Sequence, residues 1–310
     1  MWLDALLSSF YYLVSVIPPT VVGIVLMELL VELGWMQKLG SLTAPFMRFA
    51  HLREEVGISF LVSFGSPTAG NSMVADLNKK GLIDRKETMI ASLVNSFPST
   101  FIFLRDLLPV LIILLGTTGL IYLGIVVAIG FLRTAITMIL GRFLLPAKKP
   151  AAIGQEIKRE KLSRALRKAV RASITPLRRI IPTMAIAAII VFQLIDIGFF
   201  EMISVYLKNL PVLSNLPVEG LPVIAAWFAS NIGAYTIAAS LLTEGILSSK
   251  EIIITLLVGR VLSSLVRLRF TIPYYTGIFS PGLGMQIMLI SILMQEGITV
   301  IIIVLLSLFW

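Results

Sequence analysis

The chain has 310 residues, of which 57% are hydrophobic and 14% are charged, and its formal net charge is +9. An average soluble domain carries about 25% charged residues, so this composition indicates an integral membrane protein. Apolar runs at 110–132, 180–200 and 285–310 approach or exceed the roughly 20 residues of a membrane-spanning helix.

Repeat 1 begins with a spanning helix over 10–33 that contains Pro18. Residues 34–55 place apolar side chains at helical spacing between basic ones, which predicts a helix in the membrane interface. The apolar segment 56–77 is interrupted by "FGSPTAGN", and the segment 88–115 is interrupted by "NSFPST". The stretch "GTTG" at 116–119 predicts a turn, and a spanning helix follows over 120–140.

Most of the excess positive charge lies in the segment 147–176, which separates two repeats. Repeat 2 contains a spanning helix at 180–198, an interfacial piece "FFEMISVYLKNLPVLSNL" and an apolar segment 221–242 broken at "SNIGAY". A second interrupted helix at 251–278, a turn "FSPG" at 279–282 and a last spanning helix complete it. We expect repeat 1 at 1–146, a basic linker at 147–176 and repeat 2 at 177–310.

The two halves align at one offset. A shift of 164 residues aligns 13–109 with 177–273 without a gap. Glycines and charged residues match in this register: Gly81, Lys86, Glu87 and Arg105 fall on Gly245, Lys250, Glu251 and Arg269. Apolar runs match by chance, but glycines, charges and prolines in one register do not, so we infer a duplication.

The distribution of charge predicts the topology. If 56–77 crossed the membrane, the basic loop at 79–86 would lie opposite the basic residues at 38–53, against the positive-inside rule. A re-entrant hairpin places both on one side. Each repeat then has three spanning helices, one interfacial helix and one hairpin, and the odd number of crossings inverts the second repeat. The predicted fold is an all-α polytopic protein of the cytoplasmic membrane, with two inverted-topology repeats, external termini and a cytoplasmic linker.

The broken segments mark the predicted solute site. Irregular backbone inside a membrane is tolerated where it lines protein or water, and paired breaks in inverted halves point to a transporter's substrate site. The predicted solute-binding residues come from both hairpin tips, from the helices beside them and from two embedded arginines: Gly65, Ser66, Pro67, Thr68, Gly70, Asn71, Asn95, Ser96, Ser99, Thr100, Ser230, Asn231, Gly233, Tyr235, Ser263, Ser264, Arg133 and Arg260.

Charged residues inside apolar segments favour an anionic solute. An arginine at mid-membrane costs about 2.5–3.5 kcal/mol on insertion scales, so it is normally functional or paired. Snorkelling and structural ion pairs are the alternatives for each arginine. Ion-pair or gating roles are predicted for four residues: Arg105, Arg269, Glu32 and Asp196.

The sequence lacks the residue patterns that metal binding and enzyme catalysis require. The chain has no cysteine and one histidine, His51, in the charged stretch "RFAHLREE", where a surface position at the interface is the simplest interpretation. No metal or cofactor is expected. Paired carboxylates, a Ser–His arrangement and a phosphate-binding loop are also missing, so an enzyme is not expected. The N-terminal "MWLDALLSSF" lacks a basic region and a cleavage site, and we interpret it as the mature start.

The stretch "FGSPTAGNSMVADL", followed by "GLI", "KE" and a broken helix, resembles the nucleoside-recognition, or Gate, domain family, most clearly over 56–146. That family includes spore-maturation membrane proteins and the membrane part of ferrous-iron transporter B. The order of elements is also similar to that of concentrative nucleoside transporters. The resemblance implies a transport site near the hairpin tips and, by the family name, a nucleoside. The chain lacks the gate-region cysteine and the G-protein domain of the iron transporters, and acidic pockets linked to Na⁺ are not evident in the tips.

The leading hypothesis is a secondary transporter that moves a small polar, anionic or nucleoside-like solute by alternating access between the repeats. The alternative is a non-transporting scaffold or regulatory partner that docks through the basic linker. The expected partners are a small-molecule solute and membrane lipid, without nucleic acid. A coupling ion and a homo-oligomer are left open.

Overall fold

The computed structural model describes residues 2–33, 36–147, 162–196 and 217–310, and every regular element in this part is a helix. The first half contains α1 (Trp2–Glu32), α2 (Met36–Phe49), α3 (Glu54–Ser63), α4 (Pro67–Lys79), α5 (Arg85–Val94) and α6 (Phe97–Leu144). The second half contains α7 (Leu162–Asp196), the 3-10 turn η2 (Val218–Gly220), α9 (Leu221–Ala229), α10 (Asn231–Thr243), α11 (Ser249–Ile278) and α12 (Pro281–Phe309). The all-α prediction is confirmed.

Two described segments are long and apolar enough to cross a membrane, Val110–Leu144 and Pro281–Phe309. They support a membrane protein, whereas the number of six crossings stays a prediction. The interfacial piece of repeat 2 and residues 148–161 of the basic linker lie outside the described residues. The last part of the predicted linker, from 162 to 176, belongs to α7.

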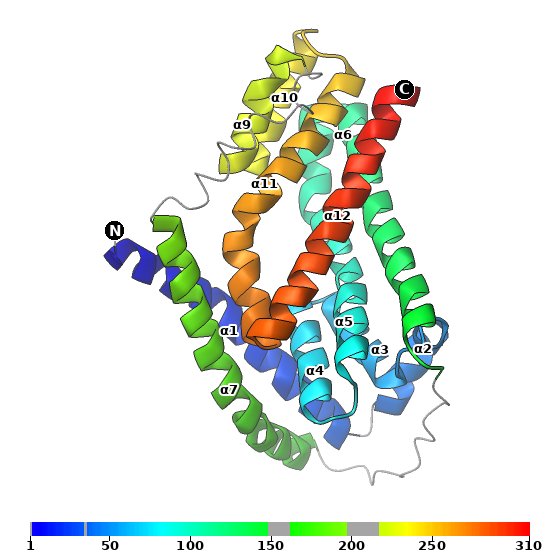
Figure 1. The fold of residues 1–310 in the computed structure, drawn as a ribbon, viewed down its shortest axis with the longest axis vertical. Helices are drawn as coiled ribbons and strands as arrows, with labels where there is room; N and C mark the ends of the chain where they lie inside the picture. Colours follow the sequence, from blue (N-terminus) through cyan, green and yellow to red (C-terminus); the bar gives the residue numbers. More distant parts are fainter. Residues whose placement is uncertain (1, 34–35, 148–161, 197–216) are drawn as a thin grey trace.

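Two pairs of short helices form helical hairpins. α3 packs on α4 and α9 packs on α10, and Figure 1 shows the first pair in the lower half and the second pair at the upper end. The predicted breaks are present. Ser66 and Ser230, 164 residues apart, have the same extended backbone (φ −153° and −160°) and each side chain accepts a hydrogen bond from the amide three residues on. A serine cap stabilises a new helix, and Pro67 at the first helical position of α4 needs no amide donor.

The long helices fold back at the two predicted turns. α6 reverses at Gly116 (φ 55°), so its two arms lie side by side, with Thr100 against Gly130. α11 and α12 are joined at Ser280 (φ 149°), which lies 164 residues after Gly116. In Figure 1 the first arm of α6 rises and the second descends, whereas α11 descends and α12 rises.

Further backbone features recur at the same spacing. Gly81 and Gly245 both have a positive φ (70° and 69°) that favours glycine, at the end of α4 and α10. The next helices start alike: Asp84 accepts from the amide of Glu87, and Ser248 accepts from that of Glu251. The equivalent helices α1 and α7 pack against each other (Figure 1). These recurrences agree with the duplication inferred from the sequence.

One predicted correspondence is wrong. The chain is broken between α5 and α6, but the equivalent part of repeat 2 is one continuous helix, α11. Pro98 lies in the first turn of α6, where a proline lacks the amide that a continuous helix would use. The position 164 residues later is Leu262, which donates its amide normally, so α11 is not interrupted.

Polar contacts join α4 to a helix of its own half and to a helix of the second half. Lys80 pairs with Glu28 of α1 (2.5 Å) and with Asp76 of α4 (2.9 Å). Burial alone would lower the pKa of Lys80, but these hydrogen bonds and charges raise it above its ordinary value. Farther along α4, the amide of Asn71 donates to the hydroxyl of Tyr274 on α11 (2.9 Å). The first hairpin is therefore anchored to both α1 and α11.

Candidate functional site

A cavity of about 680 Å³ lies between α6, α11, α12 and the tip of the second hairpin. Both arms of α6 contribute, through residues near Ser96 and residues near Arg133. The reversal at Gly116 makes this possible, because it brings positions thirty residues apart onto one wall. A volume of this size lies in the range of small-molecule pockets.

Four arginines line the cavity, Arg133 from α6 and Arg260, Arg267 and Arg269 from α11. Among the described lining residues, Glu296 of α12 is the one acidic side chain. Arg133 is 9% exposed, and its Nε has no hydrogen-bond partner in the described part of the chain. The described wall is therefore strongly cationic.

Two of these arginines lie over aromatic rings. The guanidinium of Arg260 is 5.0 Å from the ring centre of Phe103, and that of Arg269 is 4.7 Å from the ring centre of Phe270. Ring faces stabilise a guanidinium without neutralising it. Nε and Nη1 of Arg260 and Nε of Arg269 have no hydrogen-bond partner among the described residues. These donors belong to arginines of the cavity lining, and the described part of the chain leaves them unsatisfied.

Arg267 is engaged differently. Its Nη2 lies 3.3 Å from Oε1 of Glu296 and donates to the carbonyl of Arg260 at 3.3 Å. The other carboxylate oxygen, Oε2 of Glu296, is buried and has no hydrogen-bond partner in the described part. The pair joins α11 to α12 across the cavity wall.

Equivalent positions of the two repeats meet at the cavity. Ser99 and Ser263 both line it, and so do Ser96 and Arg260, each pair 164 residues apart. The first turn of α6 and, through Ser230, the start of α10 also face it. A helix N-terminus carries a partial positive charge, but α9 ends at Ser230 with the opposite partial charge, so the arginines are the main source of positive charge at the cavity.

The structure brings part of the predicted site to this cavity. The predicted residues that line it are Ser96, Ser99, Thr100, Arg133, Ser230, Asn231, Arg260, Ser263 and Arg269. The hydroxyl of Ser263 donates to the carbonyl of Arg260 at 3.1 Å, and the side-chain oxygen of Asn231 accepts from the amide of Ile232 at 3.0 Å.

The first hairpin tip does not line the cavity. This concerns Gly65, Ser66, Pro67, Thr68, Gly70 and Asn71, together with the neighbouring Asn95. Several of their side-chain polar groups bond within the protein. Asn71 donates to Tyr274 and accepts from Ser92 (3.1 Å), and Asn95 donates to Ser59 (3.1 Å). The two tips, expected to form one site, are therefore not brought together.

Aromatic rings connect the end of α3 with the start of α6. Phe64 precedes the first tip and meets Phe97 edge to face, with ring centres 6.4 Å apart. Phe60 stacks on the same ring at 6.2 Å. Phe97 follows the cavity residue Ser96 directly, so these contacts join the helix before the first tip to the α6 end of the cavity wall.

The remaining predicted residues lie elsewhere. The amide of Gly233 donates to the Ser230 hydroxyl at 3.3 Å, and Tyr235 is fully buried with its ring edge to face with Trp227. Ser264 is buried outside the lining. Glu32 lies 3.7 Å from Lys168 of α7. The side chains of Arg105 and Asp196 lie outside the described part.

Sequence reasoning missed Glu296, although a signal was present. Glu296 is the one acidic residue in the apolar run 285–310, and an ionisable residue inside such a run is a functional candidate by default. Arg267 carries the same signal and is not among the predicted site residues. No comparable signal marks Trp227, whose place in the wall follows from the packing of the second hairpin.

Comparison with known proteins agrees with the resemblance seen in the sequence. The Gate family, described as nucleoside recognition, matches residues 13–118. Uncharacterized protein MJ1556 of Methanocaldococcus jannaschii is 35% identical over 306 residues, covering 97% of each chain. MJ0871 of the same organism is 30% identical over 302 residues, covering 93% of this chain and 91% of its own. No solved structure matches the chain. The chain belongs to the Gate, or nucleoside-recognition, family of membrane proteins, together with these archaeal relatives.

Proposed function

We propose that the protein is a secondary transporter that carries a small anionic solute through the arginine-lined cavity. The observation behind this proposal is that four arginines line the cavity and one described glutamate opposes them. Buried charge inside a membrane protein costs several kcal/mol unless it is paired or used. A bare cation would be repelled by this wall, so an anion is the solute class that it suits.

Alternating access is the proposed mechanism, and the arrangement of the helices supports it. The hairpins lie toward opposite ends of the molecule, and equivalent long helices run in opposite senses (Figure 1). Both features suit two inverted repeats, here 1–146 and 177–310, each with a re-entrant hairpin. The tip of the second hairpin lines the cavity, while the tip of the first does not. In this proposal the hairpins exchange these roles during transport.

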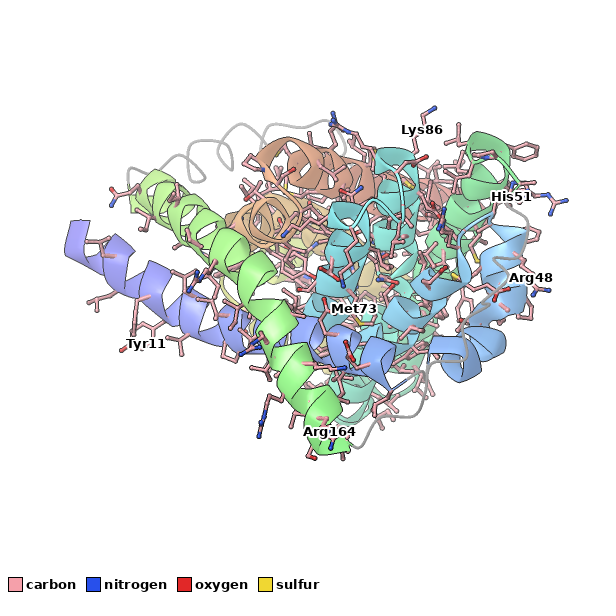
Figure 2. The ribbon with its side chains drawn as sticks, turned by 90° about the horizontal axis from the view of Figure 1, so that it is seen from below. Tyr11, Arg48, His51, Met73, Lys86 and Arg164 are labelled. Carbon is pink, nitrogen blue, oxygen red and sulfur yellow. The ribbon has the colours of Figure 1, made fainter. Side chains whose placement is uncertain are left out.

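Charge supports a topology with the lower end of the molecule in the cytoplasm. The helix ends and loops there carry basic residues: Arg48, Arg53, Lys79, Lys80, Arg85, Lys86, Arg142 and Arg164. Figure 2 shows this end from below, with Arg48, Lys86 and Arg164 reaching the rim. At the upper end, Glu244 follows α10 directly, and the first turn of α11 contains Lys250 and Glu251. The positive-inside rule then places the C-terminus outside and the linker in the cytoplasm, and the N-terminus is proposed to be external too.

Leu82 and Ile246 provide a test of the inversion. They occupy equivalent loops 164 residues apart, and both side chains are exposed (39% and 46%). The chain has no cysteine, so Leu82→Cys and Ile246→Cys each introduce one thiol. We expect a membrane-impermeant maleimide to label Ile246→Cys in right-side-out vesicles and Leu82→Cys only after permeabilisation. Labelling of both from the same side would contradict inverted repeats.

Uptake into proteoliposomes tests the transport itself. We expect protein-dependent uptake of at least one anion from a panel of sulfate, phosphate, dicarboxylates and nucleotides. Neutral nucleosides serve as the comparison, because the arginines would offer them no charge. Saturable uptake of uncharged nucleosides alone, or no flux of any solute, would contradict an anion carrier.

A further inference from the structure

We propose that the arginines of the cavity select solutes with at least two negative charges, and that the carboxylate of Glu296 limits how many negative charges the site accepts. The proposal rests on the proposed function, since it names the charge class of the solute at that same site. It follows from the balance of charge, from the unpaired donors and from the position of Glu296.

Positive charge exceeds negative charge at the cavity. The ion pair between Arg267 and Glu296 removes one arginine from the count. Arg133, Arg260 and Arg269 remain at the cavity, and no described carboxylate pairs with them. Charges interact strongly where little water screens them, so a monoanion would leave most of this positive charge unbalanced.

The unpaired hydrogen-bond donors of the arginines also favour a solute with two negative charges. Nε of Arg133, Nε and Nη1 of Arg260 and Nε of Arg269 are buried without hydrogen-bond partners in the described part. A guanidinium binds a carboxylate or phosphate through two parallel hydrogen bonds. A single carboxylate has about four lone-pair sites, which are too few to accept two parallel hydrogen bonds from each of three guanidiniums. A dicarboxylate or a phosphate ester supplies more oxygens together with the second charge.

Glu296 adjusts the charge of the site. Its Oε1 faces Arg267, whereas Oε2 is buried and unpartnered among the described residues. This carboxylate lies in the same wall as the arginines and repels any anion that enters. Neutralising it frees Arg267 and raises the positive charge of the site by one. Glu296 therefore limits the number of negative charges that the site accepts.

Matched pairs of probes separate charge from shape. We would measure thermal stabilisation and affinity of the full-length protein in detergent, at constant ionic strength, with butyrate and succinate, nitrate and sulfate, and adenosine and AMP. In each pair the second member carries about two negative charges near neutral pH or above. We expect at least one dianion to bind about tenfold more tightly than its partner. Equal affinity within all three pairs would overturn the proposal.

Two nearly isosteric changes at neighbouring positions test Glu296. Glu296→Gln removes a negative charge, and Gln295→Glu adds one to the same wall. We expect Glu296→Gln to raise the affinity for the bound dianion and for citrate about tenfold. We expect Gln295→Glu to lower both affinities by a similar factor. Glu244→Gln, at the exposed end of α10, is the matched control and should change neither. Changes in the same direction for both cavity variants would exclude an electrostatic role.

The outcomes separate this inference from transport. Preference for dianions in detergent without uptake in proteoliposomes would refute the transporter and leave the charge selectivity standing. Uptake that does not depend on the charge of the solute, together with an unchanged affinity in Glu296→Gln, would refute the charge selectivity. It would leave the transporter standing.

Discussion

Replacing Arg133 with glutamine is expected to reduce anion uptake at least about 100-fold and, at the same time, to raise the thermal stability of the protein. The loss follows because a charge-assisted contact to a buried anion contributes about 3 kcal/mol. The gain follows because Arg133 is buried and forms no ion pair among the described residues. Removing such a charge relieves about 1–3 kcal/mol of burial cost.

The expected fall in uptake and rise in thermal stability distinguish a solute-binding arginine from a structural one. A structural arginine would lower stability and uptake together when it is replaced. Arg142, on the same arm of α6, provides the control, because it lies over the ring of Phe49 (5.3 Å) and away from the cavity. Arg142→Gln should leave uptake unchanged. The measurements are thermal unfolding in detergent and initial uptake rates in proteoliposomes, and a fall in stability for Arg133→Gln would remove it from the solute site.

The local elements of this fold were largely readable from the sequence. Serine, glycine and proline at the first tip predict a helix break, and the chain breaks there with Ser66 as the cap. The turns at Gly116 and Ser280 were also predicted from their neighbours. Each of these features depends on residues within one or two turns of helix, which is why a sequence pattern can reveal them.

The composition of the site depends on contacts that no local pattern contains. Asn71 and Asn231 look alike as polar residues of two hairpin tips. Asn71 bonds to Tyr274, 203 residues away, and does not line the arginine-lined cavity, whereas Asn231 does. Similarly, the sequence marks Arg267 and Glu296 as embedded charges, but their partnership follows from how α11 packs on α12. Rotation and packing of long helices decide which marked residues meet.

The packing of α12 on α11 depends on Gly284. Replacing this glycine with alanine is expected to destabilise the protein by about 3 kcal/mol, or roughly 6–10 °C in Tm. A Cβ at Gly284 would lie 2.2 Å from the carbonyl oxygen of Tyr275, 2.5 Å from its carbon and 2.7 Å from the amide nitrogen of Thr276. All three atoms belong to the backbone of α11, so no side-chain rotation can relieve the overlap. α11 and α12 would have to move apart.

Gly282, two residues earlier in α12, is the matched control, because nothing lies within 4 Å of a Cβ built there. Gly282→Ala should be neutral or stabilise by about 0.5–1 kcal/mol, since alanine favours a helix over glycine. Tyr275 and Glu296 line the cavity from the two helices that Gly284 holds together. Gly284→Ala should therefore weaken anion binding as well as stability, while Gly282→Ala changes neither adversely. Equal stability of the two variants would mean that α11 and α12 do not approach each other this closely, and the proposed pairing of Arg267 with Glu296 would lose its structural basis.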